Sequence, residues 1–122
     1  MNQRLTPVEE EIMHHIWDMK ECTVREIINK MGDPDTPHST VSSVVRILEK
    51  KGFVDHKAYG RTHLYFPVIE RDYYLLNYLE NLEEDFFKGS TRELVSFLIR
   101  EEKLSMDDLR EIMTLINKSE EQ

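Results

Sequence analysis

The chain has 122 residues, enough for one compact domain or a small domain with an extension, and its 39% hydrophobic and 33% charged residues exclude a disordered or fibrous protein. Its longest apolar runs span only three or four residues, and its N-terminal stretch lacks the apolar segment of a signal peptide. The single cysteine, Cys22, excludes an intramolecular disulfide and fits a reducing compartment. We therefore expect a cytoplasmic protein that does not insert into membranes.

The net charge of −8 argues against general nucleic-acid affinity, but the charge is unevenly distributed. Residues 37–67 contain five Lys or Arg and two Asp or Glu, whereas the segments before and after them are acidic. Lys and Arg supply most of the affinity for DNA phosphates. This basic segment is therefore the candidate DNA contact, and the acidic remainder should suppress loose DNA binding.

Two capping boxes, over residues 6–9 and 23–26, predict where the first two helices begin. The first helix should end near Met19, and Gly32 should close the second in the left-handed conformation common at a helix end. The apolar residues expected to face the core are Val8, Ile12, Met13, Ile16 and Trp17 on the first helix, and Val24, Ile27, Ile28 and Met31 on the second. Two short amphipathic helices in this order open a helix-turn-helix pattern.

Residues 37–51 are predicted to form the third helix, with Pro37 at its first position and Gly52 directly after its end. Four apolar residues at i, i+3, i+4 and i+7 share one face and should point into a core: Val41, Val44, Val45 and Leu48. The opposite face carries small hydroxyl side chains and Arg46, and such a face fits a DNA major groove. Taken alone, this stretch also fits an ordinary core helix with a solvated polar face.

Two β-prone segments, 53–59 and 61–67, flank Gly60 and predict a hairpin. Lys57 and Arg61 lie near its tip, where they can reach phosphates beside the third helix. A plain hairpin that only covers the core is the alternative. Three helices followed directly by a basic hairpin are typical of a winged helix, so we predict a winged helix-turn-helix DNA-binding domain over residues 1–68.

From Glu70 on, three amphipathic helices are predicted, the last two beginning at caps on Ser90 and Ser105. They have little of their own to bury against, so we predict that residues 69–122 form a helical dimerisation domain, which would present two reading helices to an inverted repeat. The alternative is that they fold back on the winged helix. The expected dimer contacts are Leu75, Tyr78, Leu79, Leu82, Phe86, Leu109, Ile112, Met113 and Ile116, with Tyr73 and Tyr74 in the same interface.

The fold class predicted from this order is mainly α with one small β-hairpin. The sequence holds no phosphate-binding glycine loop, no zinc-protease helix motif and no nucleophile elbow. His14 and His15 are adjacent, so on a helix they point about 100° apart and do not make a metal site with Cys22. We therefore expect no enzyme activity, no cofactor and no metal site.

DNA contacts are predicted on the third helix and the hairpin. Arg46 is the candidate base contact, most simply to a guanine edge. The candidate phosphate contacts are Lys50, Lys51, Lys57 and Arg61, and the remaining candidates for phosphate or base contacts are His38, Ser39, Thr40, Ser42, Ser43 and His63. The partner implied is a double-stranded operator. Two other readings stay open: a module that docks a basic protein, and a regulator that senses a small molecule between its dimer arms.

Several stretches carry a family resemblance when taken in order: Leu5-Thr6, EEEIMHHIW at 9–17, Thr40-Val41 with Ser43 and Leu48, KKGFV at 50–54, Tyr65 and Pro67, and SMDDLREIMTLINK at 105–118. Together they resemble bacterial repressors of the penicillinase-repressor (BlaI/MecI) type over nearly the whole chain. The resemblance implies a winged-helix homodimer that binds inverted-repeat operators and represses genes, often those for β-lactam resistance.

The resemblance also implies a route of release. In some members, a membrane-embedded zinc metalloprotease sensor leads to cleavage between Asn and Phe in a Leu-Val-x-Asn-Phe-like context. The matching stretch here is residues 94–97, in which Phe97 matches and Ser96 does not. The bond between Ser96 and Phe97 is thus the candidate cleavage site, and the sensor a candidate partner; the alternative is that Phe97 is a core residue. With no cysteine after Cys22, the paired C-x-C motifs of copper-responsive relatives are absent.

Overall fold

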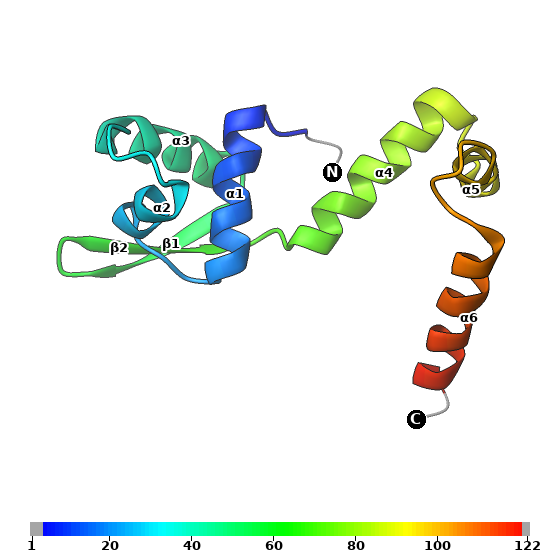
Figure 1. Ribbon diagram of the computed structural model, residues 1–122. Coiled ribbons are helices and arrows are strands. Elements are labelled where there is room, and N and C mark those ends of the chain that lie inside the picture. The colour runs from blue at the N-terminus through cyan, green and yellow to red at the C-terminus, as the bar shows by residue number, and fades with distance from the viewer. Residues whose placement is uncertain (1–3, 121–122) are drawn as a thin grey trace. The chain divides into compact units, whose positions relative to one another are not determined.

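The computed structural model describes residues 4–120, and residues 1–3 and 121–122, the outer ends of the two predicted domains, lie outside that range. The elements are, in order, α1 (Pro7–Met19), α2 (Val24–Met31), α3 (His38–Lys50), β1 (Val54–Tyr59), β2 (Thr62–Pro67), α4 (Arg71–Phe87), α5 (Thr91–Arg100) and α6 (Met106–Glu120). Three helices, an antiparallel hairpin and three further helices follow one another as predicted (Figure 1). The fold class, a winged helix followed by helices, is confirmed.

The core of the winged helix lies between α1, α2, α3 and the hairpin. Its fully buried side chains include Ile12, Met13 and Ile16 of α1, Ile27 of α2, Val41, Val45 and Leu48 of α3, and Phe53 and Val54 at the start of the hairpin. The predicted inward face of α3 is therefore confirmed. Because three side chains spread over about two turns of α3 are buried in this core, the opposite face of the helix has a fixed orientation toward solvent.

Val8 is an exception to the predicted inward face of α1, since 53% of its surface is exposed. Glu9 is buried in its place. The buried positions of α1 are thus 9, 12, 13, 16 and 17, a helical face rotated away from Val8. Glu9 tolerates burial because its carboxylate accepts hydrogen bonds from the Thr6 backbone N–H and from Lys51.

The helix ends follow local capping chemistry. The capping boxes at Thr6 and Thr23 are both complete, with each Thr hydroxyl and the Glu three residues later bonded reciprocally to backbone N–H groups. Pro37 differs from its prediction, because it is the residue before α3 rather than its first helical residue. Its φ of −68° and ψ of 137° are extended, while its carbonyl accepts the N–H of Thr40.

A pairing that the sequence did not reveal joins the hairpin to the helix-turn-helix. The Cys22 N–H donates to the Tyr65 carbonyl at 2.9 Å, and the Tyr65 N–H donates to the Cys22 carbonyl at 2.7 Å. The connection between α1 and α2 therefore adds a short bridge to the edge of β2. Both side chains are buried, and burial, together with the charge of Glu26, raises the pKa of Cys22 to about 11. This bridge ties the hairpin to the connection between α1 and α2.

The chain divides into two compact units, Met1–Tyr78 and Leu79–Gln122, with the division inside α4 rather than at the predicted position 68/69. The first turns of α4 belong to the winged-helix unit because Tyr74 is buried there. Its hydroxyl donates to Glu10 Oε2 at 2.8 Å and accepts the Leu5 backbone N–H at 3.1 Å. Trp17 adds a second tie, since its indole N–H donates to the Ile69 carbonyl at 2.9 Å. Tyr74, expected at a dimer interface, is instead a core residue of its own chain.

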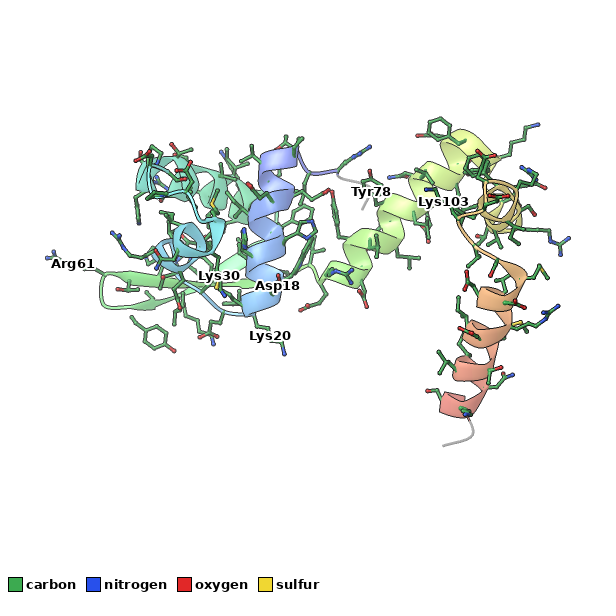
Figure 2. All side chains as sticks on the ribbon, in the orientation of Figure 1. Asp18, Lys20, Lys30, Arg61, Tyr78 and Lys103 are labelled. Atoms are coloured by element: carbon green, nitrogen blue, oxygen red, sulfur yellow. The ribbon has the colours of Figure 1, made fainter. Side chains whose placement is uncertain are left out.

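Tyr78, another predicted dimer contact, is also engaged within the winged-helix unit. The Arg4 guanidinium lies 4.4 Å from the centre of its ring and donates a hydrogen bond to its hydroxyl. Its ring also packs against that of Tyr74. Figure 2 labels Tyr78 on α4. The half-buried Tyr78 therefore contacts Arg4 and Tyr74 of its own chain. Its predicted contact with a second copy stays a prediction.

The second unit contains the rest of α4 with α5 and α6. Among its described residues, Glu83 is the one whose side chain is buried, and no apolar side chain reaches that level of burial. Phe87 and Phe97 do pack edge to face, with ring centres 5.6 Å apart. Across residues 4–120, we find no helix that combines the length and the apolar character needed to cross a membrane.

Candidate nucleic-acid interface

The outward face of α3 carries the polar residues that the sequence predicted. Arg46 and Lys50 are exposed, as are His38, Ser39, Thr40 and Ser43 near the start of the helix, while Ser42 is half-buried. The same helix buries Val41, Val45 and Leu48 on its other side. A helix held in this way can enter a major groove without changing its own conformation, because its polar face needs no rearrangement.

Arg46 is held in position by a neighbour on the same face. Its Nη2 donates to Ser42 Oγ at 3.2 Å, one helical turn earlier. A guanidinium has five N–H donors, so this bond leaves most of them available for an acceptor outside the protein. Arg46 can therefore offer the paired donors that match the O6 and N7 acceptors of guanine.

An open groove of about 690 Å³ separates α3 from the hairpin. It is lined by Ser42, Arg46, Glu49, Lys50, His56, His63 and Tyr65. A second, adjoining depression of about 370 Å³ shares Ser42, His63 and Tyr65 and adds His38, Arg61 and residues at the start of α2. The structure thus brings four of the predicted contacts on α3, His38, Ser42, Arg46 and Lys50, together with Arg61 and His63 of the hairpin. It also brings in Glu49 and His56, which were not predicted to lie in the site.

The two basic side chains near the hairpin tip differ in their contacts. Arg61 is exposed and projects from the turn between β1 and β2, as Figure 2 shows. Lys57 makes an ion pair with Glu21 at 3.3 Å and lies over the ring of Phe66. Both partners of this pair are about half exposed, and such pairs contribute at most about 1 kcal/mol. Lys57 can therefore exchange Glu21 for a phosphate at low cost.

Lys51, a predicted phosphate contact, has a partner within the chain that the sequence did not reveal. Its Nζ lies 2.9 Å from Glu9 Oε1 and 2.8 Å from Glu9 Oε2, a pairing of α1 with the residue that follows α3. Burial raises the pKa of Glu9, but hydrogen bonds from Lys51 and Thr6 and the charge of Lys51 outweigh burial and lower it overall. Because the charge of Lys51 is already paired inside the fold, we expect Lys51 to contribute less to phosphate binding than the exposed Lys50 does.

The sequence did not predict a cluster of one carboxylate and two histidine side chains in the groove. His56 Nδ1 lies 2.9 Å from Glu49 Oε1, and the His56 ring stacks on that of His63 with centres 4.2 Å apart. The strand register would have revealed the stacking, since His56 pairs with Tyr65 and His63 with Ala58, which makes the two histidines diagonal neighbours on one face. Burial and the charge of Glu49 raise the pKa of the adjacent Tyr65 hydroxyl, and Arg46 partly offsets them.

The residues predicted for dimerisation and cleavage lie on α4, α5 and α6. Of the dimerisation set, Leu75, Leu79, Phe86, Ile112, Met113 and Ile116 are exposed, and Leu82 and Leu109 are half-buried. Leu76, Leu115 and Met106 add further exposed apolar surface that the sequence analysis did not single out. Ser96 is half-buried and Phe97 exposed, and both lie inside α5.

A helix-turn-helix whose second helix offers a polar face with a positioned arginine, beside a hairpin with a basic tip, defines a winged-helix DNA-binding protein. The particular family follows from comparison with known sequences. The family model described as Penicillinase repressor matches residues 5–118. The chain therefore belongs to the penicillinase-repressor family, whose members are transcriptional repressors and not enzymes, and the resemblance inferred from the sequence is confirmed.

Individual relatives match over almost the same length. The chain is 27% identical over 115 residues to the methicillin resistance regulatory protein MecI of Staphylococcus aureus strain N315, covering 93% of this chain and 94% of the relative. It is 23% identical over 114 residues to the penicillinase repressor of Bacillus licheniformis, covering 93% and 89%. Among solved structures, the regulator BpsR of Bordetella bronchiseptica matches with 15% identity and a TM-score of 0.49, over 98% of this chain and 78% of that one.

Proposed function

We propose that this protein is a homodimeric repressor that acts in the cytoplasm and reads an inverted-repeat operator, with Arg46 at a base edge in each half-site. The proposal depends on the position of α3. Its apolar face is buried in the core, and Arg46, which is hydrogen-bonded to Ser42, lies on the opposite face. Base readout needs a side chain whose direction is set before binding. Lys50, Lys57 and Arg61 would then contact phosphates and set the register.

Dimerisation is proposed from the apolar surface that α4, α5 and α6 leave exposed. Phe86 is 76% exposed, and Met113 and Ile116 are more than half exposed. Side chains of this size are costly to leave in water, at about 25 cal/mol per Å² of apolar surface. A second copy offers the same surface, and a two-fold arrangement would pair two reading helices with the two halves of a palindromic site.

The genes under control are proposed from the relatives. The matched proteins are named for methicillin resistance regulation and for penicillinase repression. We propose that this chain likewise represses genes for resistance to β-lactam antibiotics. Purified protein should then protect DNA upstream of such a gene in its own genome, and protection of other promoters alone would contradict this part of the proposal.

Release by proteolysis between Ser96 and Phe97 is the remaining part of the proposal. Both residues lie inside α5 (Thr91–Arg100), and Phe97 packs on Phe87. Proteases cut extended, accessible chain in preference to a regular helix. We therefore propose that cleavage at this bond requires α5 to unwind first. Mass spectrometry of fragments formed in cells exposed to a β-lactam would identify the bond, and cleavage elsewhere would contradict this assignment.

The experiment that tests DNA reading is selection of binding sites from a random DNA pool at two salt concentrations. Wild-type protein should enrich an inverted repeat. Arg46→Ala should lose or broaden one position in each half-site, at a cost of about 1–3 kcal/mol per site, or about 5- to 150-fold in affinity. Arg92→Ala, an exposed arginine on α5, is the matched control and should select the same sequence as wild type.

Two outcomes would point to the other readings of the sequence. If neither wild type nor Arg46→Ala enriched any sequence at low salt, a module that docks a basic protein would replace the repressor. If sequence-specific binding were lost only on adding a small molecule, the chain would be a ligand-sensing regulator. Enrichment of a repeat that survives Arg46→Ala unchanged would keep a DNA reader but remove Arg46 from the bases.

A further inference from the structure

Three potential metal ligands converge where the end of α3 meets β1. Glu49, Asp55 and His56 each offer one ligand atom, and these atoms all lie within 4.8 Å of one another. Ligand atoms bound to one Zn²⁺ at about 2.0–2.2 Å are separated by at most about 4 Å, so small side-chain rotations would bring the three onto one ion. No other group of three such ligands is found among the residues that the structure describes.

Each of the three side chains is already oriented toward the others. His56 Nδ1 lies 2.9 Å from one oxygen of Glu49 and 3.2 Å from the other. Asp55 Oδ1 accepts the backbone N–H of His56 at 2.8 Å, which directs its carboxylate back toward His56 although the two residues are neighbours on a strand. The ring of His63, stacked at 4.2 Å and nearly parallel, restricts the rotation of His56. The cluster is therefore more ordered than isolated surface carboxylates.

We propose that Glu49, Asp55 and His56 form a binding site for one divalent transition-metal ion of the Zn²⁺ class. An imidazole with two carboxylates is a donor set suited to Zn²⁺ and similar ions, whereas Mg²⁺ and Ca²⁺ prefer oxygen ligands alone. The ion takes a position between His56 Nδ1 and the Glu49 carboxylate, and water completes the coordination. Arg46 and Lys50 line the same groove and reduce its affinity for a cation, but the exposed Lys50 side chain, for which no partner is described, can move away from the ion.

Binding of Zn²⁺ to the metal-stripped full-length protein tests the site directly. Isothermal titration calorimetry with Zn²⁺ alone should give one ion per chain for wild type. His56→Gln and Glu49→Gln should each weaken binding at least about ten-fold, since each removes a direct ligand. His15→Gln, which changes a histidine outside the cluster, is the matched control and should bind as wild type does.

Two further measurements keep this test decisive. Long-range ¹H–¹⁵N spectra of the histidine rings should show Zn²⁺ shifting the Nδ1 signal of His56. Thermal unfolding without metal shows which variants are folded. If His56→Gln or Glu49→Gln does not fold, Asp55→Asn, which changes the third proposed ligand, replaces it in the titration. Absence of Zn²⁺ binding by wild type, or equal binding by wild type and His56→Gln, would overturn the proposal.

The site has a consequence for DNA binding that rests on the proposed function. Glu49 lines the groove between α3 and the hairpin, so its carboxylate, with that of Asp55 beside it, repels phosphates, and one bound ion cancels both charges. Zn²⁺ should therefore tighten operator binding several-fold in wild type and not in His56→Gln. Zn²⁺ binding without this effect would overturn the consequence alone, whereas a metal-free protein that selects no DNA sequence would overturn the proposed function and leave the calorimetric result standing.

Discussion

Lys51 Nζ lies 2.8 Å from Glu9 Oε2, and this contact pairs the residue after the reading helix with the first turn of α1. The Glu9 side chain is 7% exposed and the Lys51 side chain 26% exposed, so water screens the pair only in part. Glu9 also caps its own helix through the Thr6 backbone N–H. One carboxylate thus fixes the start of α1 and the end of α3 relative to each other.

Glu9→Gln should lower the free energy of unfolding by about 1–3 kcal/mol, because it leaves the Lys51 ammonium without its counter-charge. In the folded protein the pKa of Glu9 is lowered, so the stabilisation is present above the usual pKa of a glutamate and is lost as the pH falls through the folded-state value. Urea unfolding from pH 7 downward should show a loss of stability below about pH 4.5 that is smaller in Glu9→Gln.

The control for this prediction is Glu11→Gln, an exposed glutamate on the same helix, which should change stability by no more than about 0.5 kcal/mol. Equal pH profiles for wild type and Glu9→Gln would show that the ion pair does not govern acid stability.

Lys50 and Lys51 are neighbours in sequence but should differ in their effect on DNA binding. Lys50 is exposed in the groove, so Lys50→Ala should reduce the slope of log affinity against log salt by about one and leave stability unchanged. Lys51→Ala should leave the slope unchanged and destabilise the fold, since its charge is paired with Glu9. Fluorescence anisotropy with operator DNA at four salt concentrations separates the two, and an equal drop in slope for both variants would mean that DNA displaces Glu9.

Phe86→Glu and Ile116→Glu should each weaken self-association at least about ten-fold, because a charge at an apolar interface must be desolvated without a partner. Sedimentation equilibrium of the full chain measures the dissociation constant. Asn117→Glu adds the same charge at the position next to Ile116 and serves as the control. A wild-type protein that remains monomeric at micromolar concentration would contradict the dimer.

Cys22 should be unreactive until the winged helix unfolds. Burial raises the pKa of its thiol to about 11, and the side chain is fully buried beside the bridge to Tyr65. At pH 7.5 only about one thiol in three thousand is then a thiolate, against about one in ten for an ordinary cysteine. Labelling by iodoacetamide should therefore follow the unfolding transition in urea. Rapid labelling of the native protein would show that the connection between α1 and α2 opens locally.

Much of the architecture was determined by the sequence itself. Helix caps at Thr6 and Thr23, the apolar spacing of α3 and the Gly60 turn are local signals that involve residues close in sequence, and the structure confirms each. The motifs along the chain also indicated the penicillinase-repressor family, and the match of the family model to residues 5–118 confirms it. The polar face of α3, with Arg46 on it, followed from the same periodicity, because burying one face of a helix defines the other.

Only the tertiary structure decided how residues far apart in sequence share charges, hydrogen bonds and burial. The sequence made Lys51 a candidate phosphate contact, whereas the structure pairs its charge with Glu9, 42 positions away. Tyr74 looked like an interface residue until its hydroxyl was found between Glu10 and Leu5. The cluster of Glu49, Asp55 and His56 likewise depends on how α3 meets the hairpin. Periodicity specifies which face of an element is apolar, but a charge or hydroxyl is assigned only by the partner that folding brings to it.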